Sequence, residues 1–343
     1  MAELTLAVDA MGGDTGLAVT VPAVAQLLKR HATVRIQMVG QPEPLAAALK
    51  EARLDSHARV SIVPAAEVVQ MDDPVSVALR NKKNSSMRIA INQLREGNAQ
   101  AVVSAGNTGA LMAVSRFVLK TLPGIERPAI CTAIPTRTGH CHMLDLGANV
   151  DAEAEHLLQF ALMGSAVVRA LDGNETPRVA LLNIGEEDIK GNDLIKQAAT
   201  LLQEHPQLNY CGFIEGNGIF AGEADVVVCD GFVGNVALKT MEGTATMIGH
   251  MLRAEIASSW LKRLSGLLAL PVLQGLKRRM DPERYNGASL LGLNGIVVKS
   301  HGGAGVPGFL AALQVALQEA ERNVPALIGA TLAADAGGDI PTA

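Results

Sequence analysis

The stretch VVSAGNTGALM (102–112) has a counterpart in VVCDGFVGNVA (227–237). Each begins as a β-branched run, breaks at a glycine, meets another glycine three residues on, and then continues with helix-forming residues. Glycine is needed for tight packing where a strand of an α/β fold turns into a crossover helix. The same junction can also aim the backbone N–H groups of a helix start at an anion. The pair of junctions therefore predicts an α/β fold and, as a second reading, a candidate anion site.

The same alternation of strands and helices runs along the rest of the chain. Strands are expected at 4–10, 34–40, 60–65, 99–105, 129–135, 141–147, 178–185 and 224–231. Helices are expected at 20–30, 85–96, 107–120, 152–171, 190–204 and 233–257. Strands that are apolar on both faces and separated by helices predict a mostly parallel sheet covered on both sides. No linker divides the chain, so we expect one composite α/β unit over 1–332 and a flexible tail over 333–343.

Composition narrows the class of protein. The 343 residues are 48% hydrophobic and 18% charged, with a net charge of −5 and only 3% aromatic residues. An acidic chain without a basic stripe or stacking aromatics is not expected to bind nucleic acid. The N-terminus lacks the pattern of a signal peptide, and the four cysteines form no paired pattern, which favours the cytoplasm. No apolar run is long enough to span a bilayer.

One segment departs from this rhythm. Residues 251–285 carry seven Lys/Arg against three Asp/Glu, a local net charge of +4 in an acidic chain. Within them, 258–285 is rich in Leu, Ala and Val between basic clusters, and Pro271 is expected to split it into two short helices. The pattern predicts an amphipathic helical hairpin. Two interpretations stay open, burial against a second subunit and contact with an anionic membrane surface, and both can hold for the same hairpin.

Polar and glycine-rich residues follow five of the expected strands. Ligands of parallel sheets collect beyond the carboxyl ends of the strands, so we expect these residues to share one rim and one anion-binding crevice. The candidates are Gly12, Gly13, Asp14, Ser104, Gly106, Asn107, Thr108, Gly109, Asp145, Asn149, Asn183, Gly185, Asp230, Gly231 and Gly234. His301, which follows a later apolar run, is a further candidate. Asn107, Thr108 and the glycine amides at their helix start are expected to hold phosphate.

Other chemistries find less support. Neither the dinucleotide pattern GxGxxG after the first strand nor the phosphate loop GxxxxGK[ST] is present, so no nucleotide cofactor is expected. His140 and His142 stand at strand spacing, but no third or fourth ligand lies near them in the sequence, so no metal is expected. No GxSxG elbow indicates a covalent acyl-enzyme. Lys190 lies where a loop meets the next helix, within reach of the rim or simply in solvent.

At these same junctions the chain resembles the PlsX-type phosphate acyltransferases of bacterial phospholipid synthesis. The matching stretches are LAVDAMGGD, KKNSSM, VSAGNTGALM, LDLGANVD, LLNIGEEDIKGN, CDGFVGNVALKTMEG, YNGASLLGL and KSHG, in the family's order from about residue 4 to about 325. The resemblance implies a fold like that of isocitrate and isopropylmalate dehydrogenases and phosphotransacetylases. It implies transfer of an acyl group from acyl carrier protein to inorganic phosphate, and an acyl phosphate product that feeds a membrane acyltransferase. It also implies a homodimer attached peripherally to the membrane.

The resemblance also assigns residues. The family's proposed catalytic pair falls on Lys190 and Asn235. We expect Lys190 to supply positive charge and Asn235 a hydrogen bond to the reacting centre, because phosphate and thioester need positioning and oxyanion stabilisation more than a strong base. The aspartates of the rim are expected to orient Lys190 and the helix-start amides, or to bind the amides of the pantetheine arm. An acidic carrier protein needs a basic landing surface, for which Arg80, Lys82, Lys83 and Arg88 are the candidates.

Three alternatives remain at this point. The first is a phosphotransacetylase-like enzyme that uses acyl-CoA. The second is a dehydrogenase-like enzyme, supported by fold analogy alone. The third is a non-catalytic scaffold at the membrane that binds carrier protein.

Overall fold

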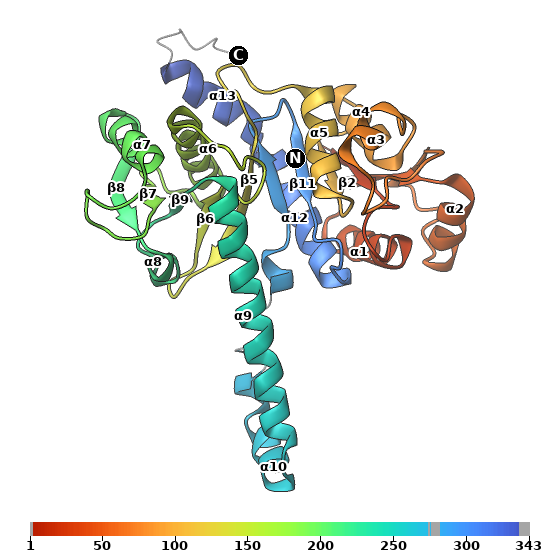
Figure 1. The fold of residues 1–343 in the computed structure, drawn as a ribbon. Coiled ribbons are helices and arrows are strands. Elements are labelled where there is room, and N and C mark those ends of the chain that lie inside the picture. Colours follow the sequence, from red (N-terminus) through yellow and green to blue (C-terminus); the bar gives the residue numbers. More distant parts are fainter. Residues whose placement is uncertain (1–2, 274, 276–281, 336–343) are drawn as a thin grey trace.

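The computed structural model describes residues 3–273, 275 and 282–335. Their core is one sheet of eleven strands flanked by helices, from which a helical hairpin projects (Figure 1). The strands are β1 Leu4–Asp9, β2 Val34–Gly40, β3 Val60–Pro64, β4 Ala101–Ser104, β5 Ala129–Pro135, β6 His140–Leu144, β7 Arg178–Leu182, β8 Asn209–Ile214, β9 Val226–Val228, β10 Ala288–Leu291 and β11 Ile296–Lys299.

Most of the crossovers between strands are helical, as the alternation in the sequence predicts. The helices are α1 Leu17–Arg30, α2 Pro42–Glu51, α3 Val75–Arg80, α4 Ser86–Arg95, α5 Thr108–Leu119, α6 Ala154–Asp172, α7 Asp193–Glu204, α8 Gly216–Ala221, α9 Gly231–Ala257, α10 Trp260–Leu268, α12 Val306–Arg322 and α13 Val324–Asp335, with a 3-10 turn at Pro282–Tyr285. The expected tail begins inside α13, because 333–335 are helical, and 336–343 lie outside the described residues.

The order of the strands divides the sheet into two parallel halves. The order is β3-β2-β1-β4-β11-β10-β5-β6-β9-β7-β8. The first five strands are mutually parallel, and so are the last four. Between them β11 and β10, β10 and β5, and β5 and β6 pair antiparallel. Three reversals leave the second half running opposite to the first. The expectation that five strand ends share one rim is therefore wrong.

Helices cover both faces of the sheet, as expected. Successive residues of each strand point to opposite faces, so neighbouring residues belong to different buried clusters. Val227 of β9 packs in a buried cluster with α4, α5 and α8 and with the first turns of α9, and this cluster extends over both halves of the sheet. Val226 and Val228 face the other way, against α6, α7 and α13. On that second face the first half of the sheet has its own cluster with α1 and α12. The face with α5 and α9 is therefore the one continuous surface that joins the halves.

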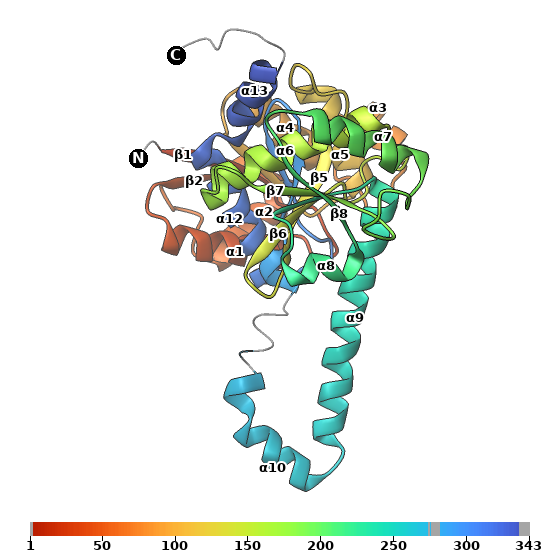
Figure 2. The same cartoon turned by 90° about the vertical axis from the view of Figure 1, so that its left-hand side faces the viewer.

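The hairpin formed by α9 and α10 extends away from the body of the molecule (Figures 1 and 2). Helix α9 has 27 residues and is therefore about 40 Å long, and only its first turns pack on the sheet. A Cβ on Gly266 would stand 2.7 Å from a methyl group of Ile256, so α10 packs closely on α9 there. Helical backbone stops at Ala269 and resumes at Leu270, beside Pro271. The basic residues Lys277, Arg278 and Arg279 lie outside the described residues.

The hairpin has little apolar burial of its own. Its exposed apolar side chains include Met247, Met251, Trp260, Leu267 and Leu268, each more than half exposed. Among the described residues no helix is long and apolar enough to cross a membrane.

Candidate functional site

Asp145 organises the loop that follows β6. Its carboxylate is buried and accepts hydrogen bonds from the backbone N–H groups of Ile130 (2.9 Å), Gly147 (3.3 Å), Ala148 (3.1 Å) and Asn149 (2.7 Å). The side-chain amide of Asn149 donates to it as well, at 3.0 Å. Burial raises the pKa of Asp145 above its usual value, and the hydrogen bonds from these donors offset only part of this rise. Asp145 and Asn149 thus form a frame for the loop, with no donor left over for an anion.

The start of α9 is fastened onto this frame. Asp230 caps the helix by accepting from the N–H of Val233 (2.9 Å), and Gly231 donates its N–H to the carbonyl of Asn149 (2.8 Å). A Cβ on Gly234 would lie 1.9 Å from the carbonyl oxygen of Asp145, a distance that no side chain tolerates. These residues therefore fix the helix in place, and the sequence expectation that Asp230 orients Lys190 finds no contact in the structure.

Asn235 is the polar group that this packing presents. Its side chain is exposed and lies over Gly147, where a Cβ would stand only 2.7 Å from the amide nitrogen. Gly147 has a φ of 124°, which also favours glycine. Among the described residues the Asn235 amide has no hydrogen-bond partner, so it is available to a ligand.

Lys190 lies at the same edge of the sheet, because β9 sits between β6 and β7. The turn that carries it is closed by a hydrogen bond from its N–H to the carbonyl of Glu187 (2.9 Å). Its alkyl chain covers Gly185, where a Cβ would be 3.0 Å from Cγ of Lys190, and Asn183 donates to the carbonyl of Gly185 (3.0 Å). Within the described residues the Lys190 ammonium forms no ion pair. Asn183 and Gly185 shape the loop, and Lys190 is its free cation.

The ends of β1, β4 and β11 form a second group at the opposite edge. Ser104 donates its hydroxyl to the buried carboxylate of Asp9 (2.7 Å) and accepts from the N–H of Gly106 (3.1 Å). Burial raises the pKa of Asp9, against the lowering effect of Ser104 and Ser86. A Cβ on Gly12 would be 2.7 Å from Asp9 and 2.8 Å from the nitrogen of Gly106. The loop is packed too closely at Gly12 for a larger residue, because the nearby atoms include the backbone nitrogen of Gly106.

Neighbouring loops close this second group. Asp14 donates its N–H to the carbonyl of Gly302 (3.0 Å), and a Cβ on Gly13 would be 3.0 Å from the same carbonyl. His301 is exposed, its Nδ1 accepts from the N–H of Gly303 (3.1 Å), and its own N–H donates to Asn286 (2.9 Å). The β11 end that carries His301 therefore meets the β1 loop that carries Asp14.

The start of α5 differs from its prediction in one respect. Asn107 caps the helix by accepting from the N–H of Ala110 (2.9 Å), and its amide nitrogen donates to the carbonyl of Met71 (2.7 Å). The side chain that was expected to hold phosphate is thus used within the protein. Thr108 and Gly109 remain exposed in the first turn, where helical N–H groups lack internal partners. A ligand at this point would meet Thr108 and the backbone rather than Asn107.

Two lysines of this region were not among the sequence candidates. Lys299, at the end of β11, is buried, and its ammonium donates to the carbonyls of Ala105 (3.3 Å) and Ser300. Burial, together with the charge of Lys239, lowers the pKa of Lys299 to about 8, although Asp14 and Asp9 act in the opposite direction. Lys239 stands four residues after Asn235 on α9. The motifs CDGFVGNVALKTMEG and KSHG contained both lysines, but nothing in the sequence indicated that they approach one another.

Lys239 links the residues around Asn235 and Lys190 to the second group, around Ser104 and His301. Residues four apart lie on one face of a helix, separated by a rise of about 6 Å. Asn235 belongs to the edge with Lys190, whereas the charge of Lys239 acts on the pKa of Lys299 at the edge with Ser104 and His301. The first turns of α9, which pack on the face of the sheet with α5, therefore lie between the two groups.

The four basic residues predicted for docking lie in and around α3 and α4, but only two are free. Lys82 is held by Asp73 (2.5 Å) and donates to the carbonyl of Val68 (2.8 Å). Arg88 stacks over the ring of Phe117, with 4.9 Å from its guanidinium carbon to the ring centre, and burial lowers its pKa. Arg80 and Lys83 are exposed. The surface offered to a partner is smaller than the sequence indicated.

The sequence and the fold of this chain resemble those of known proteins. A family model described as fatty acid synthesis protein matches residues 4–327. A protein of Alcanivorax borkumensis named phosphate acyltransferase is 72% identical over 332 residues, which cover 97% of this chain and 98% of that protein. Among solved structures, the EutD phosphotransacetylase from Staphylococcus aureus matches with a TM-score of 0.60 and 17% identity, covering 93% of this chain and 94% of that one.

A second solved structure shows the breadth of the fold. A 4-hydroxythreonine-4-phosphate dehydrogenase from Burkholderia phymatum matches with a TM-score of 0.50 and 16% identity, covering 95% of this chain and 98% of that one. At such low identities the two structures establish the fold alone. They confirm the expected likeness to both phosphotransacetylases and dehydrogenases.

Proposed function

Because the chain belongs to the phosphate acyltransferase family and is an acyltransferase, we propose that it transfers a fatty acyl group from acyl carrier protein to inorganic phosphate. The product, an acyl phosphate, would serve a membrane glycerol-3-phosphate acyltransferase in bacterial phospholipid synthesis. The single observation that carries the proposal is that Lys190, which forms no ion pair, and Asn235, whose amide has no hydrogen-bond partner among the described residues, follow neighbouring strands at one edge of the sheet in a chain with this family's motifs.

The reaction needs little acid–base help. A phosphate oxygen attacks the thioester carbonyl carbon, a new C–O bond forms, and the C–S bond breaks to release the carrier thiolate, which then takes up a proton. Much of the inorganic phosphate is dianionic near neutral pH, and the thioester is already activated. The protein contributes position and stabilises the charge that develops on the carbonyl oxygen.

Lys190 and Asn235 fit these two tasks. The exposed Lys190 ammonium forms no ion pair among the described residues, although the Glu187 carboxylate lies against the same glycine, Gly185, and we assign the Lys190 charge to phosphate. The Asn235 amide, free of internal partners and held over Gly147, donates a hydrogen bond to the developing oxyanion. Loss of one such donor typically costs about 100- to 1000-fold in rate.

The surface around α3 and the start of α5 suits the carrier protein and the prosthetic arm that holds the acyl group. The exposed Arg80 and Lys83 belong to the region of α3, which packs on α5 near Gly109, where a Cβ would be 3.2 Å from Val75. We assign the carrier protein to this surface and the phosphodiester of its prosthetic arm to the first turn of α5, beside Thr108. The arm then extends along α9, past Lys239, to bring the thioester to Asn235. This path replaces the single crevice expected from the sequence.

The projecting hairpin suits two further parts of the proposal. Its uncovered apolar side chains favour a homodimer in which a second copy packs against the hairpin. Its basic flanks and Trp260 favour peripheral contact with an anionic membrane surface, where the acyl phosphate is consumed. Light scattering tests the dimer, and sedimentation with anionic vesicles tests the membrane contact. The proposal places the enzyme in the cytoplasm, at the inner face of that membrane.

The function is tested by following thiol release. Purified protein is mixed with a long-chain acyl-carrier protein, with and without phosphate, and in parallel with the matching acyl-CoA. Phosphate-dependent release of the carrier thiol supports the proposal. Release from acyl-CoA alone would favour the phosphotransacetylase-like alternative, and a change of NAD(P) absorbance with a hydroxy acid would favour the dehydrogenase-like one. An inactive protein that still binds carrier would favour the scaffold.

A further inference from the structure

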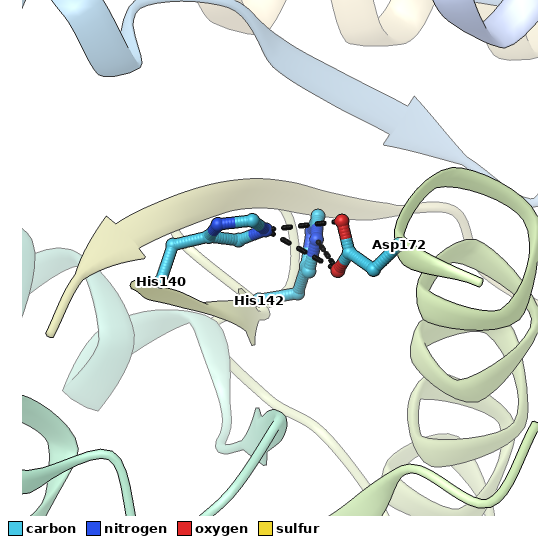
Figure 3. Close-up of side chains that lie close together, drawn as sticks. All are labelled: His140, His142 and Asp172. Carbon is cyan, nitrogen blue, oxygen red and sulfur yellow. Dashed lines mark hydrogen bonds and ion pairs between the residues drawn. The ribbon is translucent and has the colours of Figure 1, made fainter. Parts of the chain in front are cut away.

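Two histidines and an aspartate from separate elements meet at the beginning of β6 (Figure 3). His140 and His142 project from alternate positions of the strand, on one face. Asp172 is the last residue of α6, thirty residues further along the chain. Nε2 of His140 is 3.2 Å from each carboxylate oxygen of Asp172, and Nε2 of His142 is 3.1 Å from one of them.

The separations of these atoms match a metal coordination sphere. The candidate ligand atoms all lie within 4.8 Å of one another. In a tetrahedral zinc site with bonds of about 2.0 Å, neighbouring ligand atoms are about 3.3 Å apart. Each Nε2 atom is already near this distance from the shared carboxylate, and the largest separation in the cluster, within 4.8 Å, closes with adjustments of the side chains.

Asp172 stands where a negative charge alone is unfavourable. The carboxyl end of a helix carries a partial negative charge, and a carboxylate in the last turn adds to it. Helix α6 ends directly after Asp172, at Gly173 with a left-handed φ of 69°. A cation at this point neutralises both the side chain and the helix end. A protonated His140 would meet the same need, so the helix end favours a cation beside Asp172 and the distances between the ligand atoms carry the choice of a metal ion.

Protein groups hold His142 from the other side. Its Nδ1 lies 3.9 Å from the buried thiol of Cys131, and its backbone N–H donates to the carbonyl of Asp225 (2.8 Å). The His142 side chain is only 9% exposed, whereas those of His140 and Asp172 are 38% and 30% exposed. The site is therefore anchored in the protein at one ligand and open to solvent at the others, which leaves room for a water ligand.

The geometry points to a divalent transition-metal site formed by His140, His142 and Asp172, suited to Zn²⁺ by its two imidazoles and one carboxylate. The ion ties the first residues of β6 to the end of α6. Along the strand, His140 stands roughly 16 Å and His142 roughly 10 Å from Asp145. The site therefore stabilises the fold and takes no part in acyl transfer.

Metal binding to the full-length protein tests the inference. The protein is stripped with a chelator and titrated with Zn²⁺ by calorimetry and with Co²⁺ by visible absorption. We expect one equivalent to bind, with a tetrahedral cobalt spectrum, and to raise the melting temperature. Asp172→Asn keeps the shape of the side chain and should weaken binding at least about tenfold, and His140→Ala should do the same.

The controls separate this site from adventitious binding. His57→Gln removes an imidazole elsewhere, and Cys211→Ser removes the one cysteine that is exposed among the described residues. Both should bind as the unaltered protein does. Melting of each stripped variant shows whether it is folded without metal. The inference is overturned if the unaltered protein shows no saturable binding, or if Asp172→Asn and His140→Ala bind as tightly as it does.

Discussion

The amide nitrogen of Asn235 lies 2.7 Å from the position that a Cβ on Gly147 would occupy. The nearest atom is the far end of a flexible side chain, so an alanine at 147 would push the Asn235 amide aside without colliding with backbone. Gly234 is different, because there the nearest atom is the Asp145 carbonyl at 1.9 Å. Gly147 therefore controls the position of the proposed catalytic amide, and Gly234 controls the fold.

Gly147→Ala tests this relationship. We expect kcat to fall about 100-fold, because a shift of about 1 Å in a catalytic group is enough to do so. The protein should remain folded. Gly124→Ala is the control, since Gly124 also has a positive φ, of 84°, but nothing within 4 Å of its Cβ position. Equal losses of activity in both variants would show that backbone strain, and not Asn235, is responsible.

Lys190→Ala tests the proposed cation. The expected loss is about 100- to 1000-fold in kcat with unchanged thermal stability, because Lys190 is exposed and forms no ion pair within the described residues. Lys196→Ala removes an exposed lysine on the following helix and should leave the rate unchanged. A Lys190→Ala enzyme with normal kcat would exclude a catalytic role for this side chain.

Thr108→Val separates the two substrates. If the first turn of α5 holds the phosphodiester of the donor, the variant raises KM for the acyl-carrier protein and leaves KM for phosphate unchanged. A higher KM for phosphate alone would place the nucleophile at α5, as the sequence first indicated, and would overturn the path along α9.

Reversal of charge tests the docking surface. Lys83→Glu should weaken carrier-protein binding and reduce its dependence on salt, because Lys83 is exposed, while Lys50→Glu on α2 should have no effect. Lys82→Glu should instead lower thermal stability, because it breaks the ion pair with Asp73. Carrier binding by Lys83→Glu that equals that of the unaltered protein would contradict the assignment.

Glu319 gives the stability of the fold a specific pH dependence. It is fully buried on α12 beside the hydroxyl of Ser289, and burial raises its pKa from 4.5 to about 7. Its folded form therefore holds a proton that the unfolded chain releases at lower pH. The protonated Glu319 side chain makes its full contribution to the free energy of unfolding below about pH 4.5. This contribution is lost as the pH rises to about 7.

Urea unfolding at pH 5 and pH 8 measures this effect. We expect the free energy of unfolding to fall by on the order of 2 to 3 kcal/mol between them through Glu319. Glu319→Gln should remove most of that fall. Glu321→Gln changes an exposed residue of the same helix and should leave it intact. If Glu319→Gln retains the full fall, another group is responsible for it.

The sequence predicted local structure well because local structure depends on neighbours along the chain. The expected strands at 34–40 and 129–135 match β2 and β5 in full. The direction of the second half of the sheet was not predictable in this way. It depends on β10 and β11, short strands from 288–299 that insert between β4 and β5. Their pairing joins segments more than 150 residues apart, and no local pattern specifies it.

The candidate site shows the same limit. The residue types at the strand ends were predicted, and an asparagine before a helix is a common cap. The amide nitrogen of Asn107 donates to the carbonyl of Met71, which lies on a loop 36 residues away in the chain. The third member of the histidine cluster, Asp172, is likewise distant from His140 and His142 in the chain. Contacts between distant segments decide which side chains remain free for a ligand.

The central claim is that inorganic phosphate itself attacks the acyl thioester of the carrier protein. The most direct measurement uses phosphate labelled with ¹⁸O at every oxygen and mass analysis of the acyl phosphate formed from long-chain acyl-carrier protein. Direct attack predicts that the product retains all of the label, with one carrier thiol released per acyl phosphate. A product that has lost one labelled oxygen, or thiol release without acyl phosphate, would contradict the account.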